Sequence, residues 1–237
     1  MKHKTSLLFF LFCCHITLLL AQERRGYDFT TYSDFVAENL DITFKKPKGF
    51  IDQNINKWIF YPELEHKRGG YAYASALQSK DEDCLIMYPV LEDGAVTLDD
   101  LRNTEWPFSQ MKGELLDALG FDKNIKVPEA DIKELQPYFR SLSSEEAKRL
   151  FNSDVAYISD HSLPIPYREV YTHVVGIYLG KAGRPVVFVK CFFTEKGKEK
   201  KDTFLKRLYK SIEYSNDAWT FDREKFIENQ KRLRQQK

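Results

Sequence analysis

The histidines are the first residues in this chain that could do chemistry. His161 lies in the run Ser159-Asp160-His161-Ser162, which contains the residue types of a hydrolase triad, whereas His66 stands alone among charged residues. Adjacent residues in an extended chain point in different directions, however, and a triad is defined by its geometry in space. The run alone therefore does not establish a catalytic site.

A second polar pair, His173 and Lys190, lies within the two most strand-like runs of the chain, at 170–179 and 186–194. Both runs are rich in Val, Ile, Tyr and Phe, so we expect them to pair as a hairpin. If the turn between them is centred, Val175 faces Lys190, and His173 lies one cross-strand step away on the same face. This pair would either line a cleft or form the edge of the core, with the lysine reaching solvent.

The segment between these runs, GKAGR at 180–184, has the glycines and the lysine of a phosphate-binding loop. Such a loop joins a strand to a helix and carries Ser or Thr after the lysine, so that backbone N–H groups meet the phosphate. Here Pro185 leads into another strand, and neither Ser nor Thr follows Lys181. We therefore predict a hairpin turn with Ala182-Gly183 at its tip and with Lys181 and Arg184 in solvent.

Two acidic clusters, Asp81-Glu82-Asp83 and Asp99-Asp100, offer carboxylates to a cation. Neither has the spacing of an EF-hand loop, and no His/Cys cluster has zinc-ligand spacing. Weak calcium binding and an ordinary solvated turn are the two alternatives. We expect no metal and no cofactor. The sequence also has no nucleophile elbow, dinucleotide fingerprint or HExxH motif.

Cys84 and Cys191 are the cysteines that follow the N-terminal segment. In an exported protein they could form a disulfide across a long loop, worth up to ~4–5 kcal/mol of stability. Both lie in apolar, strand-like surroundings, which equally suit two buried free thiols.

The N-terminal segment predicts export. A basic start precedes an apolar stretch at 7–20, and Ala21 offers a small residue for cleavage, so we predict a signal peptide over 1–21. An uncleaved anchor is the alternative, although a membrane span needs about 20 apolar residues. Cys13 and Cys14 lie in mid-stretch without small residues before them, which argues against a lipoprotein.

Charge in the remaining chain is nearly balanced, with 34 Lys or Arg against 35 Asp or Glu. A nucleic-acid partner usually requires a basic surplus, so we expect none. Residues 195–237 are more basic, with 13 Lys or Arg against 8 Asp or Glu. This end could contact an acidic partner or an anionic surface, or it could be a solvated helix face.

The elements predict a single α+β domain over 22–215, with a helical insertion at about 95–165 and a basic C-terminal helix or tail at 216–237. A central hairpin at about 168–194 is apolar on both faces, so we expect a mainly antiparallel sheet covered by helices on both sides. A helix at 199–210 supplies one apolar stripe. The other expected strands are 40–44, 57–61, 70–77, 84–91 and 155–158, and the other expected helices are 32–36, 106–119, 131–139, 143–151 and 222–235, the last of them frayed.

The two ends of this domain carry a resemblance. The segment ITFKKPKGF at 42–50, the long hairpin, and a helix ending in LKRLYKSIEY at 205–214 resemble the PsbP/Mog1-type α/β/α sandwich. The second pattern is carried by Phe204, Leu205, Leu208, Ser211 and Ile212. Members of that fold range from photosynthetic accessory proteins to GTPase-binding factors, so no site residue and no activity follow. The whole chain also resembles exported proteins common in gut-type Gram-negative bacteria, a resemblance that again implies no activity.

We therefore predict an exported, non-catalytic binding or assembly protein of the cell envelope, periplasmic or secreted. We expect a monomer that binds an envelope component and keeps no transmembrane segment after cleavage. The alternative is a hydrolase that uses His161 or His173 with nearby carboxylates, and Lys190 is the third candidate residue. A pocket that gathers a histidine, an acid and a nucleophile would favour the enzyme.

Overall fold

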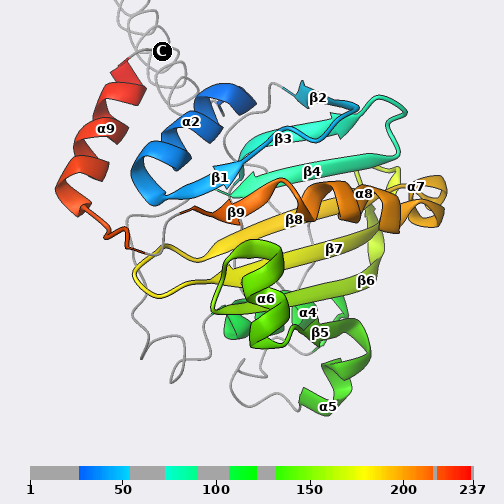
Figure 1. Ribbon diagram of the computed structural model, residues 1–237. Helices are drawn as coiled ribbons and strands as arrows, with labels where there is room; N and C mark the ends of the chain where they lie inside the picture. Colours follow the sequence, from blue (N-terminus) through cyan, green and yellow to red (C-terminus); the bar gives the residue numbers. More distant parts are fainter. Residues whose placement is uncertain (1–26, 54–72, 90–106, 122–131, 216–217, 236–237) are drawn as a thin grey trace, which may run out of the picture.

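A seven-stranded antiparallel sheet is the centre of the computed structural model, which describes residues 27–53, 73–89, 107–121, 132–215 and 218–235 (Figure 1). The strand order is β2-β3-β4-β8-β7-β6-β5, and β1 and β9 form a separate pair. The strands are β1 (Ile42–Phe44), β2 (Phe50–Gln53), β3 (Tyr73–Ser79), β4 (Cys84–Pro89), β5 (Phe139–Ser141), β6 (Val155–Tyr167), β7 (Tyr171–Gly180), β8 (Val187–Phe193) and β9 (Ile212–Tyr214).

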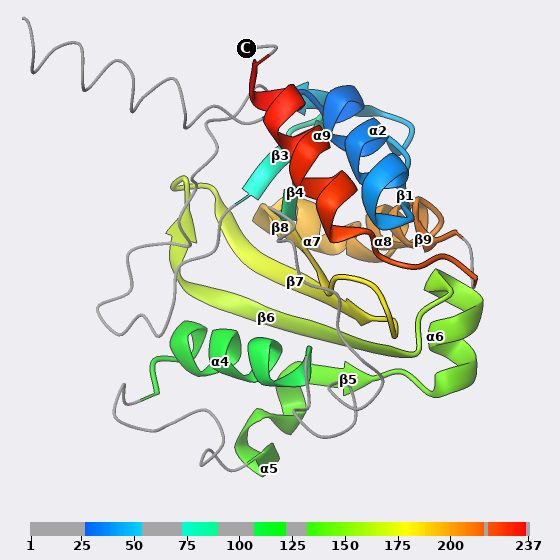
Figure 2. The same ribbon diagram turned by 90° about the vertical axis from the view of Figure 1, so that its left-hand side faces the viewer.

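Helices cover both faces of this sheet. They are α2 (Phe29–Leu40), α4 (Phe108–Ala118), α5 (Ile132–Leu135), the 3-10 helix η2 (Gln136–Tyr138), α6 (Ser144–Phe151), α7 (Glu195–Glu199), α8 (Lys201–Tyr209) and α9 (Arg223–Gln235). Figure 2 shows α4 on one side of β6 and β7, with α2, α8 and α9 on the other. The predicted α+β class with a mainly antiparallel, two-sided sheet is therefore confirmed.

The larger core lies on what we call the α8 face, the side of the sheet that carries Ile158, Val175 and Cys191. Apolar side chains of α2, α6, α8, α9, β1 and β9 pack against this face. Burying this apolar area is the main source of stability, at roughly 25 cal/mol per Å². The opposite side, which we call the α4 face, carries Tyr178 and Phe192 and packs against α4 at one end.

Local sequence signals set the helix boundaries. Ser143 and Glu146 form the predicted capping box at the start of α6, with each side chain bonded to the other residue's backbone N–H. The Thr194 side chain caps α7 by accepting a hydrogen bond from the Gly197 N–H. A Cβ on Gly197 would lie 2.0 Å from the Asp83 carbonyl oxygen, so only glycine lets α7 approach β4 this closely.

The register of the central hairpin differs from the predicted one by one residue. Lys190 pairs with Gly176, and Val175 pairs with Cys191. Because side chains alternate between faces, this shift puts His173 on the α8 face and Lys190 on the α4 face. The predicted His173–Lys190 pair is therefore wrong.

The turn of this hairpin is packed rather than solvated. Lys181 and Arg184 are 5% and 2% exposed, against the prediction that both lie in solvent. The Lys181 ammonium donates to the Asn152 carbonyl oxygen over 2.7 Å, and the Arg184 guanidinium donates to Asp41 Oδ2 over 3.0 Å. The last pair of the ladder is Leu179–Val187, so an odd number of residues lies between the paired strands. A two-residue tip has an even number, which is why the register differs by one residue. Gly183 has the positive φ expected of it, +76°.

The region predicted as a helical insertion, at about 95–165, contains the helices α4, α5 and α6, but it also contributes β5 and most of β6 to the main sheet. The strand predicted at 155–158 extends to Tyr167. Pro164 and Pro166 fit β6 because the register is irregular between Ser162 and Tyr167, where a missing N–H leaves no ladder bond unmade.

The C-terminal helix α9 is a packed element rather than a frayed tail. Phe226 is 1% exposed and lies against Phe35 of α2. The Asn229 side chain donates to Asn39 Oδ1 over 2.6 Å. The basic residues of α9 therefore lie on a helix that packs beside α2 (Figures 1 and 2).

Several predictions fall on residues that the structure does not describe: the signal peptide, His66, Asp99-Asp100 and the strand at 57–61. Among the helices that are described, none is long and apolar enough to span a membrane.

The thiols of Cys84 and Cys191 are both free and buried. They occupy diagonal rather than opposite positions, because Cys84 pairs with Phe193 and Cys191 pairs with Ile86. Diagonal neighbours lie about 7–8 Å apart, beyond the usual Cα separation of a disulfide. Burial also raises the pKa of both thiols, which lowers their reactivity.

We therefore expect residues 22–237, which contain only these two cysteines, to resist thiol alkylation when native and to take up two labels when denatured. Intact mass measured without reductant checks the same point. A native mass lower by two hydrogens, with no label in denaturant until a reductant is added, would show a disulfide instead.

Candidate functional site

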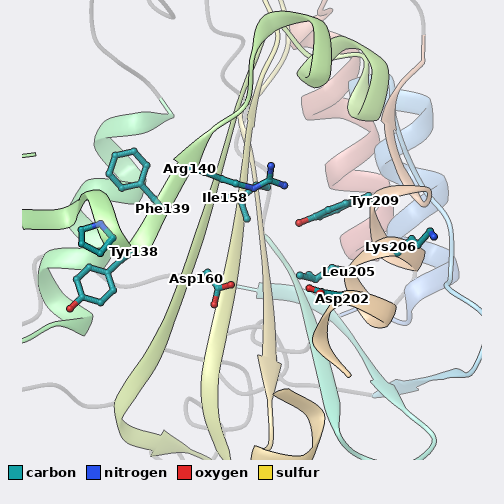
Figure 3. A pocket seen from close by; sticks show the side chains of 10 residues that line it. Tyr138, Phe139, Arg140, Ile158, Asp160, Asp202, Leu205, Lys206 and Tyr209 are labelled. Atoms are coloured by element: carbon teal, nitrogen blue, oxygen red, sulfur yellow. The ribbon is translucent and has the colours of Figure 1, made fainter. Parts of the chain in front are cut away.

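A cleft of about 470 Å³ lies on the α8 face, between α8 and the edge strands β5 and β6 (Figure 3). Arg140, Ile158 and Asp160 line it from the sheet. Asp202, Leu205, Lys206 and Tyr209 line it from α8. Pro137, Tyr138 and Phe139 also border it, although the rings of Tyr138 and Phe139 point away from it, toward the α4-face cluster (Figure 3). The volume is within the range of small-molecule sites.

Strand and helix periodicities place these side chains. Arg140 pairs with Ile158 across β5 and β6, so both point to the α8 face, together with Asp160 two residues further along β6. On α8 the buried stripe contains Leu205, while Lys206 lies outside the stripe and is exposed. The cleft therefore has an apolar floor of Ile158 and Leu205 and a charged rim.

Asp160 connects the sheet to the beginning of α8. Its Oδ1 lies 2.5 Å from His173 Nε2, and its Oδ2 accepts a hydrogen bond of 2.5 Å from the Lys201 ammonium. Burial alone would raise the pKa of Asp160, but the hydrogen bonds from His173 and Lys201 outweigh it and lower the pKa to about 2. Asp160 is therefore a carboxylate at neutral pH, and its charge is compensated within the site.

Arg140 and Tyr209 point toward each other across the cleft (Figure 3). Burial raises the pKa of the Tyr209 hydroxyl, whereas the charge of Arg140 and its hydrogen bond to Tyr209 act in the opposite direction. The guanidinium has five N–H donors, so donors remain after one contact with the tyrosine. This end of the cleft therefore presents two donor groups side by side.

His161 does not belong to this cleft. It lies on the α4 face opposite Val174, and its Nδ1 is 3.2 Å from the Ser162 carbonyl oxygen. Burial lowers the pKa of His161 to about 4, so the ring is neutral at physiological pH. The run Ser159-Asp160-His161-Ser162 alternates between two faces of the sheet and does not assemble a triad.

His173 is the histidine that the structure brings to an acid, but it is held away from a nucleophile. Its Nε2 is occupied by Asp160, and its Nδ1 is buried with no hydrogen-bond partner among the described residues. A general base must reach the proton of the nucleophile directly or through one water. Among the described residues, no hydroxyl or thiol lies within hydrogen-bond distance of either ring nitrogen of His173.

Lys190, the third candidate, lies under α4 in a buried polar network. Its ammonium forms an ion pair with Glu114 of α4, donates to the Tyr178 hydroxyl and lies 4.4 Å from the centroid of that ring. Tyr178 also donates to Glu114, and burial lowers the pKa of Lys190. The network joins α4 to the sheet and has no access to solvent, since Lys190 is 1% and Glu114 3% exposed.

Gly176 makes room for this network. A Cβ at that position would lie 2.6 Å from both Ser159 Oγ and the Tyr178 ring. Only glycine therefore lets Tyr178 fold along β7 to reach Lys190 and Glu114. The sequence signals that could have found the network are a lysine inside the apolar run VVFVKCFF and a glutamate beside Leu115 and Leu116 in a helix.

The carboxylates of the acidic turn at 81–83 form ion pairs with lysine side chains. The Lys200 ammonium lies 2.8 Å from Asp81 Oδ2 and 2.5 Å from Asp83 Oδ2. The hydrogen bond from Lys200 is the main reason that the pKa of Asp81 is lowered. Among the residues that the structure describes, no group of three or more His, Cys, Asp or Glu side chains is arranged to hold a metal ion.

Comparison of the chain with protein-family models, with curated proteins and with solved structures finds no match. The resemblance to the PsbP/Mog1-type sandwich therefore stays a prediction.

Removing one member of the buried ion pair should be costly. We expect Lys190→Met to destabilise the protein by about 3–5 kcal/mol, because the Glu114 carboxylate would stay buried without its cation. Adding Glu114→Gln, which keeps an acceptor for Tyr178, should restore most of that loss. Urea unfolding measures both values, with the exposed Lys198→Met as the control. A cost below about 1 kcal/mol for the single variant would show that the pair does not hold α4 to the sheet.

The Asp160 links predict a pH-dependent contribution to stability. The folded pKa lies below the unfolded one, so the contribution is complete above about pH 4 and is lost as pH falls toward 2. Because Asp160 is 42% exposed, solvent screening reduces it to about 1 kcal/mol. We expect Asp160→Asn to cost that amount at pH 7 and almost nothing near pH 2, as measured by denaturant titration at several pH values. An equal cost at both pH values would contradict this assignment.

Proposed function

We propose that the protein is an exported, non-catalytic binding protein of the cell envelope, whose ligand binds in the cleft between α8 and strands β5 and β6. The carrying observation is the cleft itself, where an apolar floor of Ile158 and Leu205 lies below a rim of charged and hydroxyl groups. Ligand sites are commonly concave and mostly apolar, with a few placed polar groups that set orientation.

The walls of the cleft are held in place before any ligand arrives. Asp160 ties the beginning of α8 to β6 and β7 through Lys201 and His173. Leu205 and Leu208 of α8 are buried in the main core. A prearranged site loses little conformational entropy on binding, which supports a binding role.

The hydrolase alternative gains no support from the geometry. His161 and His173 point to opposite faces of the sheet. His161 Nδ1 lies beside the Ser162 carbonyl oxygen, and the two ring nitrogens of His173 face Asp160 and buried space. Catalysis by either residue would need a nucleophile within hydrogen-bond reach. Export itself rests on the sequence pattern of residues 1–21.

The test compares the natural ligands retained by an open and by a blocked cleft. Residues 22–237 and the variant Asp202→Trp, whose indole would fill the cleft, are each passed through envelope extract, and the bound small molecules are identified by mass spectrometry. Asp222→Trp, which places the same ring at an exposed position outside the cleft, is the control.

We expect at least one molecule that the wild type and Asp222→Trp retain and that Asp202→Trp loses. Equal retention by all three proteins would contradict a ligand site in the cleft. If the purified protein also turned over ester or peptide substrates, and His161→Ala or His173→Ala abolished that turnover, the hydrolase reading would replace ours.

A further inference from the structure

Among the described residues, the charged side chains around the cleft differ in whether they form ion pairs. Asp160 has two cationic or hydrogen-bonding neighbours, His173 and Lys201. By contrast, Arg140 and Lys206 form no ion pair with any carboxylate that the structure describes, although both line the cleft. Asp202 lies four residues before Lys206 on α8, a spacing at which the two charges partly offset each other. Among the described residues, Arg140 is therefore the lining cation that has neither an ion pair nor a carboxylate at helical i, i+4 spacing.

The position of Arg140 suits a side chain that binds an anion better than one that is only solvated at the surface. Its guanidinium lies beside the Tyr209 hydroxyl, and both groups point into the cleft (Figure 3). If Tyr209 accepts from Arg140, its own O–H remains available to donate in the same direction. A guanidinium fork matches a carboxylate or a phosphate in two parallel hydrogen bonds, and a neighbouring hydroxyl adds a third.

The rest of the cleft is apolar where a ligand body would lie. Ile158 and Leu205 are 4% and 7% exposed and form the floor. The Tyr138 ring points away from this floor, toward the α4-face cluster (Figure 3). From these observations, and resting on the proposed binding function, we infer that the ligand is a small anionic amphiphile. Its single carboxylate or phosphate binds Arg140 and Tyr209, and its apolar chain lies on Ile158 and Leu205.

Four ten-carbon probes that differ only in their head group test this inference. Decanoate and decyl phosphate carry the anion, decanol is neutral, and decyltrimethylammonium is cationic. Isothermal titration calorimetry on residues 22–237, below the micelle concentration of each probe, gives the dissociation constants. We expect the two anions to bind at least tenfold more tightly than decanol, and the cation to bind more weakly than decanol.

Variants assign that preference to the two donors. We expect Arg140→Met to weaken decanoate binding at least tenfold while leaving decanol binding within about twofold, because a charge-assisted hydrogen bond is lost only for the anion. Tyr209→Phe should weaken decanoate several-fold. Arg149→Met, which removes an exposed arginine of α6 outside the cleft, is the matched control and should change neither constant. Arg140→Gln replaces Arg140→Met if the latter fails to fold.

A separate binding experiment with lipid vesicles distinguishes the two possible sources of the anion, a lipid head group and a free amphiphile. Binding to phosphatidylglycerol-containing vesicles that Arg140→Met removes would identify a lipid head group. Decanoate binding without vesicle binding would identify a free amphiphile.

Two results would overturn the inference. One is equal binding of decanoate and decanol, and the other is anion binding that Arg140→Met leaves unchanged. In either case, ligands from extract that Asp202→Trp excludes would still establish the cleft as a site. Loss of that exclusion would contradict the proposed function itself.

Discussion

The apolar character of β7 and β8 on both faces is the constraint on which the rest of the structure depends. Val175, Ile177 and Val189 point to one side, and Val174 and Phe192 point to the other. A sheet of this kind cannot leave either face in water. The chain therefore places α8 and its neighbours over one face and α4 over part of the other, and the two polar sites arise where these covers meet the sheet.

The helices on the two faces of the sheet leave the charged side chains beneath them in opposite environments. Under α4 the polar groups are enclosed, and Lys190 and Glu114 satisfy each other away from solvent. Beside α8 the sheet extends past the helix to β5, so the covering is incomplete and leaves a cleft with Arg140 at its rim. An enclosed, satisfied pair fixes an element in place, whereas an open cation beside an apolar floor is available to a ligand. This contrast is the physical basis for treating one cluster as structural and the other as a binding site.

Sequence patterns predicted the sheet class and several elements but not the site. The hairpin strands, the capping box at Ser143 and the apolar stripe of α8 all follow from local chemistry, and all were predicted. The register of the hairpin was not, because it depends on the length of the loop after the Leu179–Val187 pair, which no local sequence signal sets. That single shift moved Lys190 to the other face and removed the expected pair with His173.

The cleft itself has no local signature. Arg140 belongs to a three-residue strand of which only Phe139 fell within a predicted element, the helix at 131–139. Asp160 was noted only as a residue type in the run Ser159-Asp160-His161-Ser162. Their meeting with Tyr209 requires β5, β6 and α8 to pack together, which periodicity alone cannot specify.

Chemical-shift mapping with labelled protein tests most directly whether ligands bind between α8 and the β5–β6 edge. Titration with decanoate should perturb the amide signals of Arg140, Ile158, Leu205 and Tyr209 first and leave those of α4 and α9 unchanged. Perturbations centred on Tyr178 and Glu114 instead, or spread evenly over the protein, would contradict the account.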